Sequence, residues 1–294
     1  MDPALAARYW RAIAASNMVG HVPRALQLKV ASRARTLYQA LGQSRRVFSS
    51  LILRARHDYR GRQHEAAKSA LGEARRLTRS EWPAEFHIHL LRRNSLNARE
   101  AGRSAEALAL MREAARISAA TRDWRLEVID RTDLIDTMWL LGMVEEAARE
   151  ACTPVGELRA KPAADADMSS AFANAIGCLS ETGRIDEATC AARDALPIMR
   201  RAGSYTVEEW AYLVWRRGQR EAAARLIGAS DAQCIKDDAP RQLNEERLIA
   251  RARADLEEAI GAAAFAASLA AGARRGEAEL VALISEALAQ APGK

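Results

Sequence analysis

Histidine and cysteine are the side chains of this 294-residue sequence that most readily bind metals or act in catalysis. His87 and His89 are two residues apart, which on a helix points them to different sides. Zinc proteases instead place two ligands four residues apart around a glutamate. His57 and His64 lie on either side of Gly61, but no carboxylate or cysteine completes a ligand set there. We therefore interpret the histidines as structural or surface residues and predict no metal site.

Nucleophilic and acid–base catalysis have no stronger candidates. The sequence contains no Gly-x-Ser-x-Gly elbow. Cys178 and Cys190 are predicted to lie in the core, on the two helices of one repeat. Two pairs of carboxylates are better explained as solvated faces or as helix N-terminal charges, namely Asp133 with Asp136 and Glu145 with Glu146. We predict that the protein is not an enzyme.

Phosphate-binding loops are missing as well. The sequence has no Gly-x-x-x-x-Gly-Lys-Ser/Thr loop to hold a nucleotide. The nearest stretch, Gly272-Ala-Arg-Arg-Gly276, has neither the lysine with its hydroxyl residue nor a preceding strand. We predict no cofactor.

The cysteines and the first residues bear on the cellular compartment. Cys152, Cys178, Cys190 and Cys234 lie far apart, and we interpret them as mostly buried free thiols in a reducing cytoplasm. Met1-Asp2-Pro3 is not the start of a signal peptide. The longest uncharged stretch, Ala259–Ala273, has 15 residues and is too short to span a bilayer. We expect a cytoplasmic protein without a membrane partner.

The composition indicates which elements hold these side chains. Alanine makes up about a fifth of the chain, while the 16 Gly and 8 Pro fall below average usage. Ala, Leu, Arg and Glu are strong helix formers because they lose little side-chain entropy in a helix. The composition excludes a collagen, a disulfide scaffold, a β-sandwich and a disordered acidic tail, and it predicts a nearly all-α protein.

A repeat of about 41 residues organises these helices. Each copy has a Gly, then three variable residues, an acidic residue and an Ala, as in Gly102-Arg-Ser-Ala-Glu106-Ala107. The turns fall near Gly20, Gly61, Gly102, Gly142, Gly183 and Gly218, with Gly218 opening a shortened copy and Gly20 a degenerate one. Glycine ends a helix at low steric cost, and the acidic residue suits the positive N-terminus of the next helix. The small Ala (Ala66, Ala107, Ala147, Ala188 and Ala222) lets two helices approach closely, so each copy predicts a helical hairpin.

This unit resembles the tetratricopeptide repeat (TPR), whose usual period of 34 residues is shorter than the one here. The resemblance implies a right-handed TPR-like α-solenoid of about six hairpins, because each hairpin leaves an apolar face that only a neighbour covers. We predict a repeat array over residues 1–239 and a C-terminal helical cap, packed on the array, over residues 240–294.

The C-terminal part adds a second resemblance. The run from Glu221 to Ser230, the helix from Asn244 to Glu258 and the final helix from Glu277 to Ala289 resemble the end of large bacterial LuxR-like or winged-helix transcriptional regulators with an ATPase module. The resemblance implies a sensor arm for signal transduction, either a stand-alone protein or part of a longer regulator. Its partner would be a protein or peptide, and an ATPase or DNA-binding domain of the same system is one candidate. The oligomeric state stays open.

Charge is unevenly distributed along the chain. Of the net +6, residues 1–100 carry 19 Lys and Arg against 7 Asp and Glu, whereas residues 101–294 carry 25 against 31. We predict a basic docking patch, which would serve an acidic partner or a further domain, at Arg45, Arg46, Arg54, Arg56, Arg60 and Arg62. The alternative function is association with nucleic acid through these basic repeats, with a steep dependence on salt.

The leading prediction is a protein–protein interaction module that holds a partner segment in a concave groove lined by the first helix of each hairpin. Counting back from the turn glycines predicts the groove residues His89, Arg92, Arg99, Thr132, Asp136 and Trp139. The two arginines would clamp a carboxylate, and Trp139 would serve as an apolar anchor. Ordinary exposed side chains and one packed Trp are the alternative interpretation.

Overall fold

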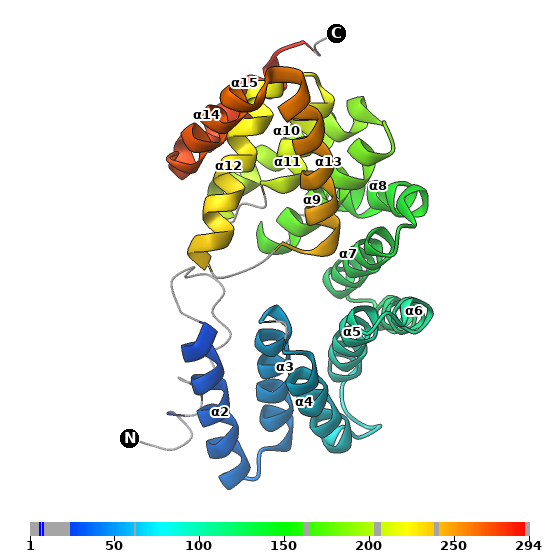
Figure 1. Ribbon diagram of the computed structural model, residues 1–294. Coiled ribbons are helices and arrows are strands. Elements are labelled where there is room, and N and C mark those ends of the chain that lie inside the picture. The colour runs from blue at the N-terminus through cyan, green and yellow to red at the C-terminus, as the bar shows by residue number, and fades with distance from the viewer. Residues whose placement is uncertain are drawn as a thin grey trace. The chain divides into compact units, whose positions relative to one another are not determined.

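The computed structural model describes residues 6, 8, 24–61, 63–160, 165–202, 207–237 and 241–291. Over these ranges the chain forms fourteen α-helices and no strand, which confirms the all-α prediction (Figure 1). The helices are α2 (Arg24–Ala40), α3 (Ser44–Arg60), α4 (His64–Leu77), α5 (Ala84–Glu100), α6 (Ser104–Thr121), α7 (Trp124–Leu140), α8 (Val144–Ala160), α9 (Asp165–Glu181), α10 (Ile185–Ala202), α11 (Glu208–Arg216), α12 (Arg220–Asp237), α13 (Leu243–Ile260), α14 (Ala262–Ala273) and α15 (Glu277–Ala289).

A recurring turn joins these helices in pairs. After α5, Gly102 has a φ of 72° and its N–H bonds the carbonyl of Arg99, while the N–H of Arg103 bonds the carbonyl of Ala98 at 2.8 Å. This pair of hydrogen bonds is the Schellman motif, in which a residue in the left-handed conformation lets backbone N–H groups bond the last carbonyls of a helix. The same two bonds recur at Gly42, Gly142, Gly183 and Gly218. The glycine repeat in the sequence is therefore a repeat of helix ends.

The register of two turns differs from the sequence prediction. At Gly61 φ is −88°, and the N–H that bonds the carbonyl five residues earlier belongs to Gln63, two residues after the glycine. At the other turns this donor directly follows the glycine, so Gly61 stands one position earlier in its turn than the other glycines do. The buried alanine there is consequently Ala67, and Ala66 is only half-buried. After Gly218 the buried alanine is Ala223, so that copy is not shortened.

The first predicted turns need a further correction. Gly42, with a φ of 66°, forms an additional turn between α2 and α3 that the 41-residue spacing did not predict. Gly20 lies outside the described residues.

The chain divides into two compact units. Unit 1 comprises Met1–Asp130 with Asp237–Ala239, and unit 2 comprises Arg131–Lys236 with Pro240–Lys294. The boundary falls within α7, and residues 240–294 share a unit with residues 131–236. The reason is packing, because α13 contacts α11 and α15 contacts both α10 and α11.

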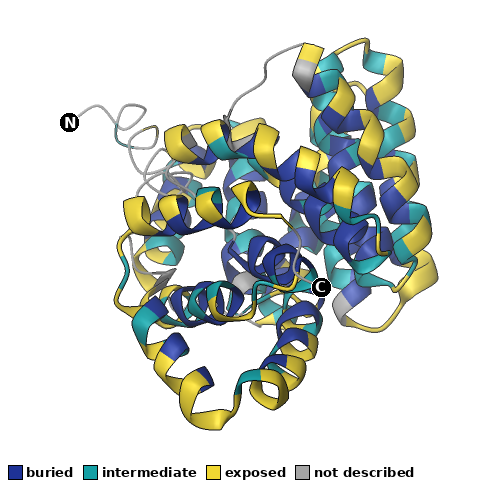
Figure 2. Cartoon of the chain, turned by 90° about the horizontal axis from the view of Figure 1, so that it is seen from above, coloured by how far each residue is buried: buried dark blue, intermediate teal, exposed yellow. Residues whose placement is uncertain are grey.

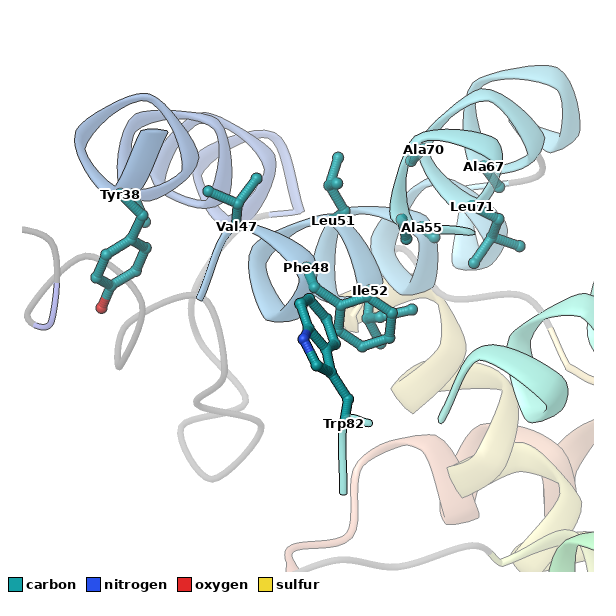
Figure 3. Close-up of a cluster of buried hydrophobic side chains, with 12 residues drawn as sticks. Tyr38, Val47, Phe48, Leu51, Ile52, Ala55, Ala67, Ala70, Leu71 and Trp82 are labelled. Atoms are coloured by element: carbon teal, nitrogen blue, oxygen red, sulfur yellow. The ribbon is translucent and has the colours of Figure 1, made fainter. Parts of the chain in front are cut away.

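Unit 1 is held together by large side chains. Buried residues recur along one side of its helices, as Figure 2 shows for the whole chain. Figure 3 shows Phe48 of α3 beside Trp82, which precedes α5, and their ring centroids lie 5.8 Å apart in an edge-to-face arrangement. Phe86 packs 5.2 Å from Trp82, and Tyr38 of α2 is fully buried in the same cluster. Aromatic pairs of this geometry stabilise a core beyond their buried area.

Unit 2 combines large buried side chains, among them Trp139, Trp210 and Tyr212, with close backbone approach. A Cβ on Gly228 of α12 would collide with the backbone of Leu269, and a Cβ on Gly272 of α14 with that of Arg225. These two glycines allow α12 and α14 to touch along their backbones. Gly177 of α9 gives similar room to the ring of Trp139.

Candidate functional site

The clearest candidate surface in unit 2 is the face formed by the first helix of each hairpin, α7, α9 and α11. Helix α13 of the same chain lies against it. Arg247 of α13 pairs with Glu181 of α9 at 3.1 Å and donates to the backbone carbonyl of Trp139 in α7. One face made by three successive hairpins therefore binds one helix. We call it the first-helix face of unit 2.

Both ends of α13 take part in this contact. Near its start, Asn244 is buried and donates to Asp136 of α7 at 3.4 Å. Further along, Asp255 accepts a hydrogen bond of 2.6 Å from the indole N–H of Trp215 in α11. Between them, the apolar residues Leu248, Ile249 and Ala252 of α13 are buried. The contact combines an apolar stripe with charged and polar pairs at its edges.

A second polar cluster fixes the segment that leads into α13. Glu208 of α11 accepts hydrogen bonds from Ser230 of α12 and from Arg241, the latter at 3.2 Å. Arg241 also pairs with Asp231 at 2.7 Å, and Asp231 pairs in turn with Arg253 of α13. Each charge in this cluster has an opposite charge beside it, so the cluster holds α11, α12 and α13 together.

Burial within this region raises the pKa of two ionisable side chains, Glu245 and Cys178. Burial raises the pKa of Glu245 from 4.5 to about 7, and the nearby carboxylate of Glu208 adds to the effect. Burial also raises the pKa of the Cys178 thiol, and Asp136 and Glu181 raise it further. The raised pKa favours the neutral thiol of Cys178. Only a thiolate is nucleophilic, so this side chain serves packing.

The predicted groove residues in unit 2 lie on this face, but two of them are buried. The ring of Trp139 is fully buried against Gly177, and its N–H donates to Glu181 at 2.7 Å. Thr132 is buried and its carbonyl accepts from Asn174. Asp136 is half-buried beneath α13. The side chain of Trp139 therefore joins α7 to α9, and it is not an accessible anchor.

In unit 1 the predicted groove residues also divide into packed and exposed positions. Arg92 of α5 forms a buried ion pair of 2.7 Å with Asp130 of α7. Arg99 is buried and donates to the hydroxyl of Tyr59 in α3 at 2.8 Å. Only His89 is exposed. The arginines that were predicted to clamp a ligand thus hold neighbouring helices together.

The predicted basic patch is a set of residues with different surroundings. Arg45 and Arg46 are exposed, Arg56 is half-buried, and Arg54 pairs with Asp58 of its own helix at 3.4 Å. The side chain of Arg60 is not described, and Arg62 lies outside the described residues.

Arg45 and Arg46 line a hollow at the start of α3, which we call the arginine hollow. Its volume is about 630 Å³, and its lining consists of Gly42, Gln43, Ser44, Arg45, Arg46, Arg79 and Trp82. The guanidinium of Arg45 lies over the ring of Trp82 at 5.8 Å, and that of Arg46 lies over Tyr38 at 5.6 Å. Sequence analysis predicted the two arginines but missed Arg79 and Trp82, because only folding brings the end of α4 beside the start of α3.

The histidines and cysteines form no metal-type cluster in the part of the chain that the structure describes. No group of three His, Cys, Asp or Glu residues suited to a metal occurs among those residues. His57 is buried, and Cys178 is buried as predicted. Cys152 and Cys190 are exposed, which corrects the expectation that the thiols are mostly buried. Cys190 lies on the outer side of α10, since the helix turns its alanines inward.

Membrane insertion finds no support in these helices either. Among the described residues, none of the helices combines the length and the apolar character that a membrane span requires.

Solved structures provide the comparison with known proteins. Sixteen solved chains match, and one is the crystal structure of BtubC (BKLC) from P. vanneervenii. It is similar with a TM-score of 0.53 and 16% sequence identity, over 81% of this chain and 92% of that chain. At this identity the likeness is one of fold alone. No family model matches the sequence, and no curated protein matches it.

Proposed function

We propose that the protein is a right-handed TPR-like α-solenoid of about six hairpins that binds a helical segment of a protein partner on its first helices. The observation that carries this proposal is α13, which lies against α7, α9 and α11 through the pairs of Arg247 and Asn244. A face that holds a helix of its own chain has the spacing that a helix from a partner needs. The mechanism is non-catalytic binding.

The partner segment is expected on the first helices of unit 1, α3 and α5, because α13 occupies the equivalent face of unit 2. The register of the turns allows a direct comparison of charge. We count back from the residue whose N–H bonds the carbonyl five residues earlier, which is Gln63 after α3, Arg103 after α5 and Met143 after α7. Seven residues before it stand Arg56 in α3 and Asp136 in α7. Ten residues before it stand Arg93 in α5 and Asp133 in α7. Asp136 accepts a hydrogen bond from Asn244 of α13, and Arg247 of the same helix pairs with Glu181 of α9. The basic positions of unit 1 therefore favour an acidic helix.

A photo-crosslinking experiment in cells tests this proposal on the full chain. The photoreactive amino acid benzoylphenylalanine replaces His89, which is exposed on the first helix α5. The matched control replaces Arg112, which is exposed on the second helix α6. We expect a protein adduct from position 89 whose crosslinked peptide is helical and net acidic, and none from position 112. Equal labelling at both positions, or a basic crosslinked peptide, would contradict the proposal.

We further propose that this binding serves a bacterial signalling or transcriptional regulatory system in the cytoplasm. The resemblance of residues 221–289 to the sensor region of LuxR-like regulators with an ATPase module is what supports this role. A partner would act by its different affinity for two curvatures of the array, because only differential affinity shifts a conformational equilibrium. The test is whether the crosslinked partner is an ATPase or DNA-binding protein. An adduct with neither kind of domain would contradict the regulatory role.

Association with nucleic acid is the second candidate function. It is favoured by Arg45 and Arg46, which are exposed and have no ion pair among the described residues. Phosphate contacts release counterions, so affinity for a duplex or single strand would fall about 10³-fold or more between 50 and 200 mM salt if six or more phosphates are contacted. A salt series with labelled DNA and RNA measures this dependence. Absence of binding at the lowest salt would exclude this function.

A further inference from the structure

We propose that the arginine hollow of unit 1 binds the phosphoryl group of a small ligand. The hollow lies at the start of α3, and titration with a small anion tests it separately from the binding of a protein partner. Its basis is the chemistry of the lining, since the hollow collects hydrogen-bond donors and positive charge around a volume of about 630 Å³.

All the polar side chains that line the hollow are able to donate hydrogen bonds, and none is a carboxylate. Arg45, Arg46 and Arg79 supply three positive charges. The amide of Gln43 does not cap α3, and the hydroxyl of Ser44 has no hydrogen bond within the described part of the chain. A ligand with several anionic oxygens complements this set of donors.

Aromatic rings hold two of the guanidinium groups in place. Arg45 lies over Trp82 at 5.8 Å and over Phe86 at 5.9 Å, while Arg46 lies over Tyr38 at 5.6 Å. These rings belong to the buried cluster of unit 1, and the ring of Trp82 is itself fixed by Phe48. A guanidinium that stacks by its face keeps the N–H groups at its edge for a bidentate contact with an oxyanion. The stacking therefore lowers the entropic cost of ordering these arginine side chains when a ligand binds.

Arg79 is the adjustable member of the set. Its guanidinium lies 4.0 Å from the carboxylate of Glu81, and both side chains are well exposed. Glu81 does not line the hollow. Because this ion pair is loose, Arg79 can turn to a ligand at little cost, and removal of the Glu81 charge should favour that turn.

The size and surface of the hollow select a small phosphoryl ligand over a nucleic acid strand. Three guanidinium groups match the double negative charge of a phosphoryl group better than the single charge of a carboxylate. Binding of a single strand relies on aromatic faces that stack with successive bases. Trp82 is only 8% exposed, so its face is not available for a base.

Isothermal titration of the full chain with inorganic pyrophosphate tests the proposal. We expect one site in the wild type and a loss of affinity of about tenfold or more in the variant Arg45→Gln/Arg46→Gln/Arg79→Gln, since each charge-assisted hydrogen bond contributes at about that level. The matched control is Lys29→Gln/Arg33→Gln/Arg112→Gln, which removes three exposed cations of unit 1 outside the hollow. The control should bind within about twofold of the wild type, because distant exposed charges are screened by salt.

A variant that is expected to bind pyrophosphate more tightly than the wild type serves as a second test, because misfolding would not raise affinity. Glu81→Gln should raise the affinity for pyrophosphate by about twofold or more, with helicity and unfolding temperature unchanged. Titration with ADP separates the sources of the phosphoryl group, and an affinity equal to that of pyrophosphate would show that the hollow recognises that group alone. The proposal is overturned if the wild type does not bind pyrophosphate at low salt, if succinate binds as tightly, or if both triple variants lose affinity equally.

Discussion

Units 1 and 2 are built from the same kind of helical hairpin, but they use charge in different ways. In unit 2, Asp136 and Glu181 lie on the first-helix face, and α13 brings Asn244 and Arg247 to meet them. In unit 1, Arg56 of α3 stands where α7 carries Asp136, Arg93 of α5 stands where α7 carries Asp133, and the start of α3 adds the arginine hollow. Unit 2 thus receives a helix of its own chain on acidic positions, whereas the compared positions of unit 1 are basic.

The two cores differ in a corresponding way. Unit 1 contains a cluster of large aromatic residues that includes Phe48 and Trp82, while unit 2 brings helices into backbone contact at Gly228 and Gly272. A rigid aromatic core can hold arginines in a defined orientation by stacking. Close helix packing instead allows a long helix such as α13 to join several hairpins. Unit 1 thus keeps arginines beside its aromatic core, and unit 2 keeps α13 against α7, α9 and α11.

The largest expected effect tests whether unit 1 also depends on an internal charge pair. Arg92→Ala should lower the free energy of unfolding by about 3–5 kcal/mol, because it leaves the buried carboxylate of Asp130 without this partner. The control is Arg116→Ala, which breaks an exposed pair of 2.6 Å with Glu113 and should leave stability nearly unchanged, because water screens an exposed pair. Urea unfolding followed by circular dichroism measures both. Equal effects would show that burial does not decide the strength of these pairs.

Close backbone packing in unit 2 is tested by Gly228→Ala. We expect a loss of about 2–3 kcal/mol, because the added Cβ would collide with the backbone of Leu269 and force α12 and α14 apart. Gly156→Ala in α8 is the matched control, since nothing lies near the added Cβ and alanine favours a helix by about 0.5–1 kcal/mol. Thermal unfolding should therefore move in opposite directions for the two variants. A stabilised Gly228→Ala would refute the close contact.

The attachment of α13 is tested by Arg247→Leu. Loss of the contacts with Glu181 and Trp139 should lower stability by about 2 kcal/mol and increase hydrogen exchange in α13 more than elsewhere. Arg251→Leu removes an exposed arginine of the same helix and should leave exchange unchanged. Hydrogen exchange with mass spectrometry gives the comparison. If α13 stays equally protected in both variants, the charged pair does not hold the helix on its face.

The smallest effect concerns the pH dependence of unit 2. Because the folded-state pKa of Glu245 is raised from 4.5 to about 7, the folded chain binds this proton more tightly than the unfolded chain. Stability from this group is complete below about pH 4.5 and declines as pH rises towards 7. Glu245→Gln should therefore stabilise the protein at pH 8 and do so much less at pH 5. A gain of the same size at both pH values would show that desolvation of the carboxylate is not the cause.

Much of the fold was predictable from local signals in the sequence. The glycine period located the turns at Gly102, Gly142 and Gly183, where the structure has helix ends. The prediction was less accurate where one residue of register matters, since Ala67 and Ala223 are buried where Ala66 and Ala222 were expected. Spacing between glycines does not show whether a glycine stands at the left-handed position or one residue before it.

The candidate sites were predicted only in part. Asp136 and Trp139 were assigned to the first-helix face, but nothing local showed that the chain itself would cover that face or that the Trp139 ring would enter the space left by Gly177. Arg92 and Arg99 were expected to bind a ligand and instead pair with Asp130 and Tyr59. Their partners lie about 40 residues away in the sequence. Periodicity predicts where each arginine lies along its helix, but it does not predict which side chain of a neighbouring helix the arginine contacts.

The sequence by itself determined the helices, their turns and the excess of positive charge in the first third, because each depends on neighbouring residues and on composition. The tertiary structure decided which charges are neutralised. Arg247 meets Glu181 because α13 folds back over three earlier hairpins, and Arg45 is held over Trp82 because α3 packs beside the end of α4. Burial and long-range pairing determine the energy of a charge, and both arise only when distant helices pack together.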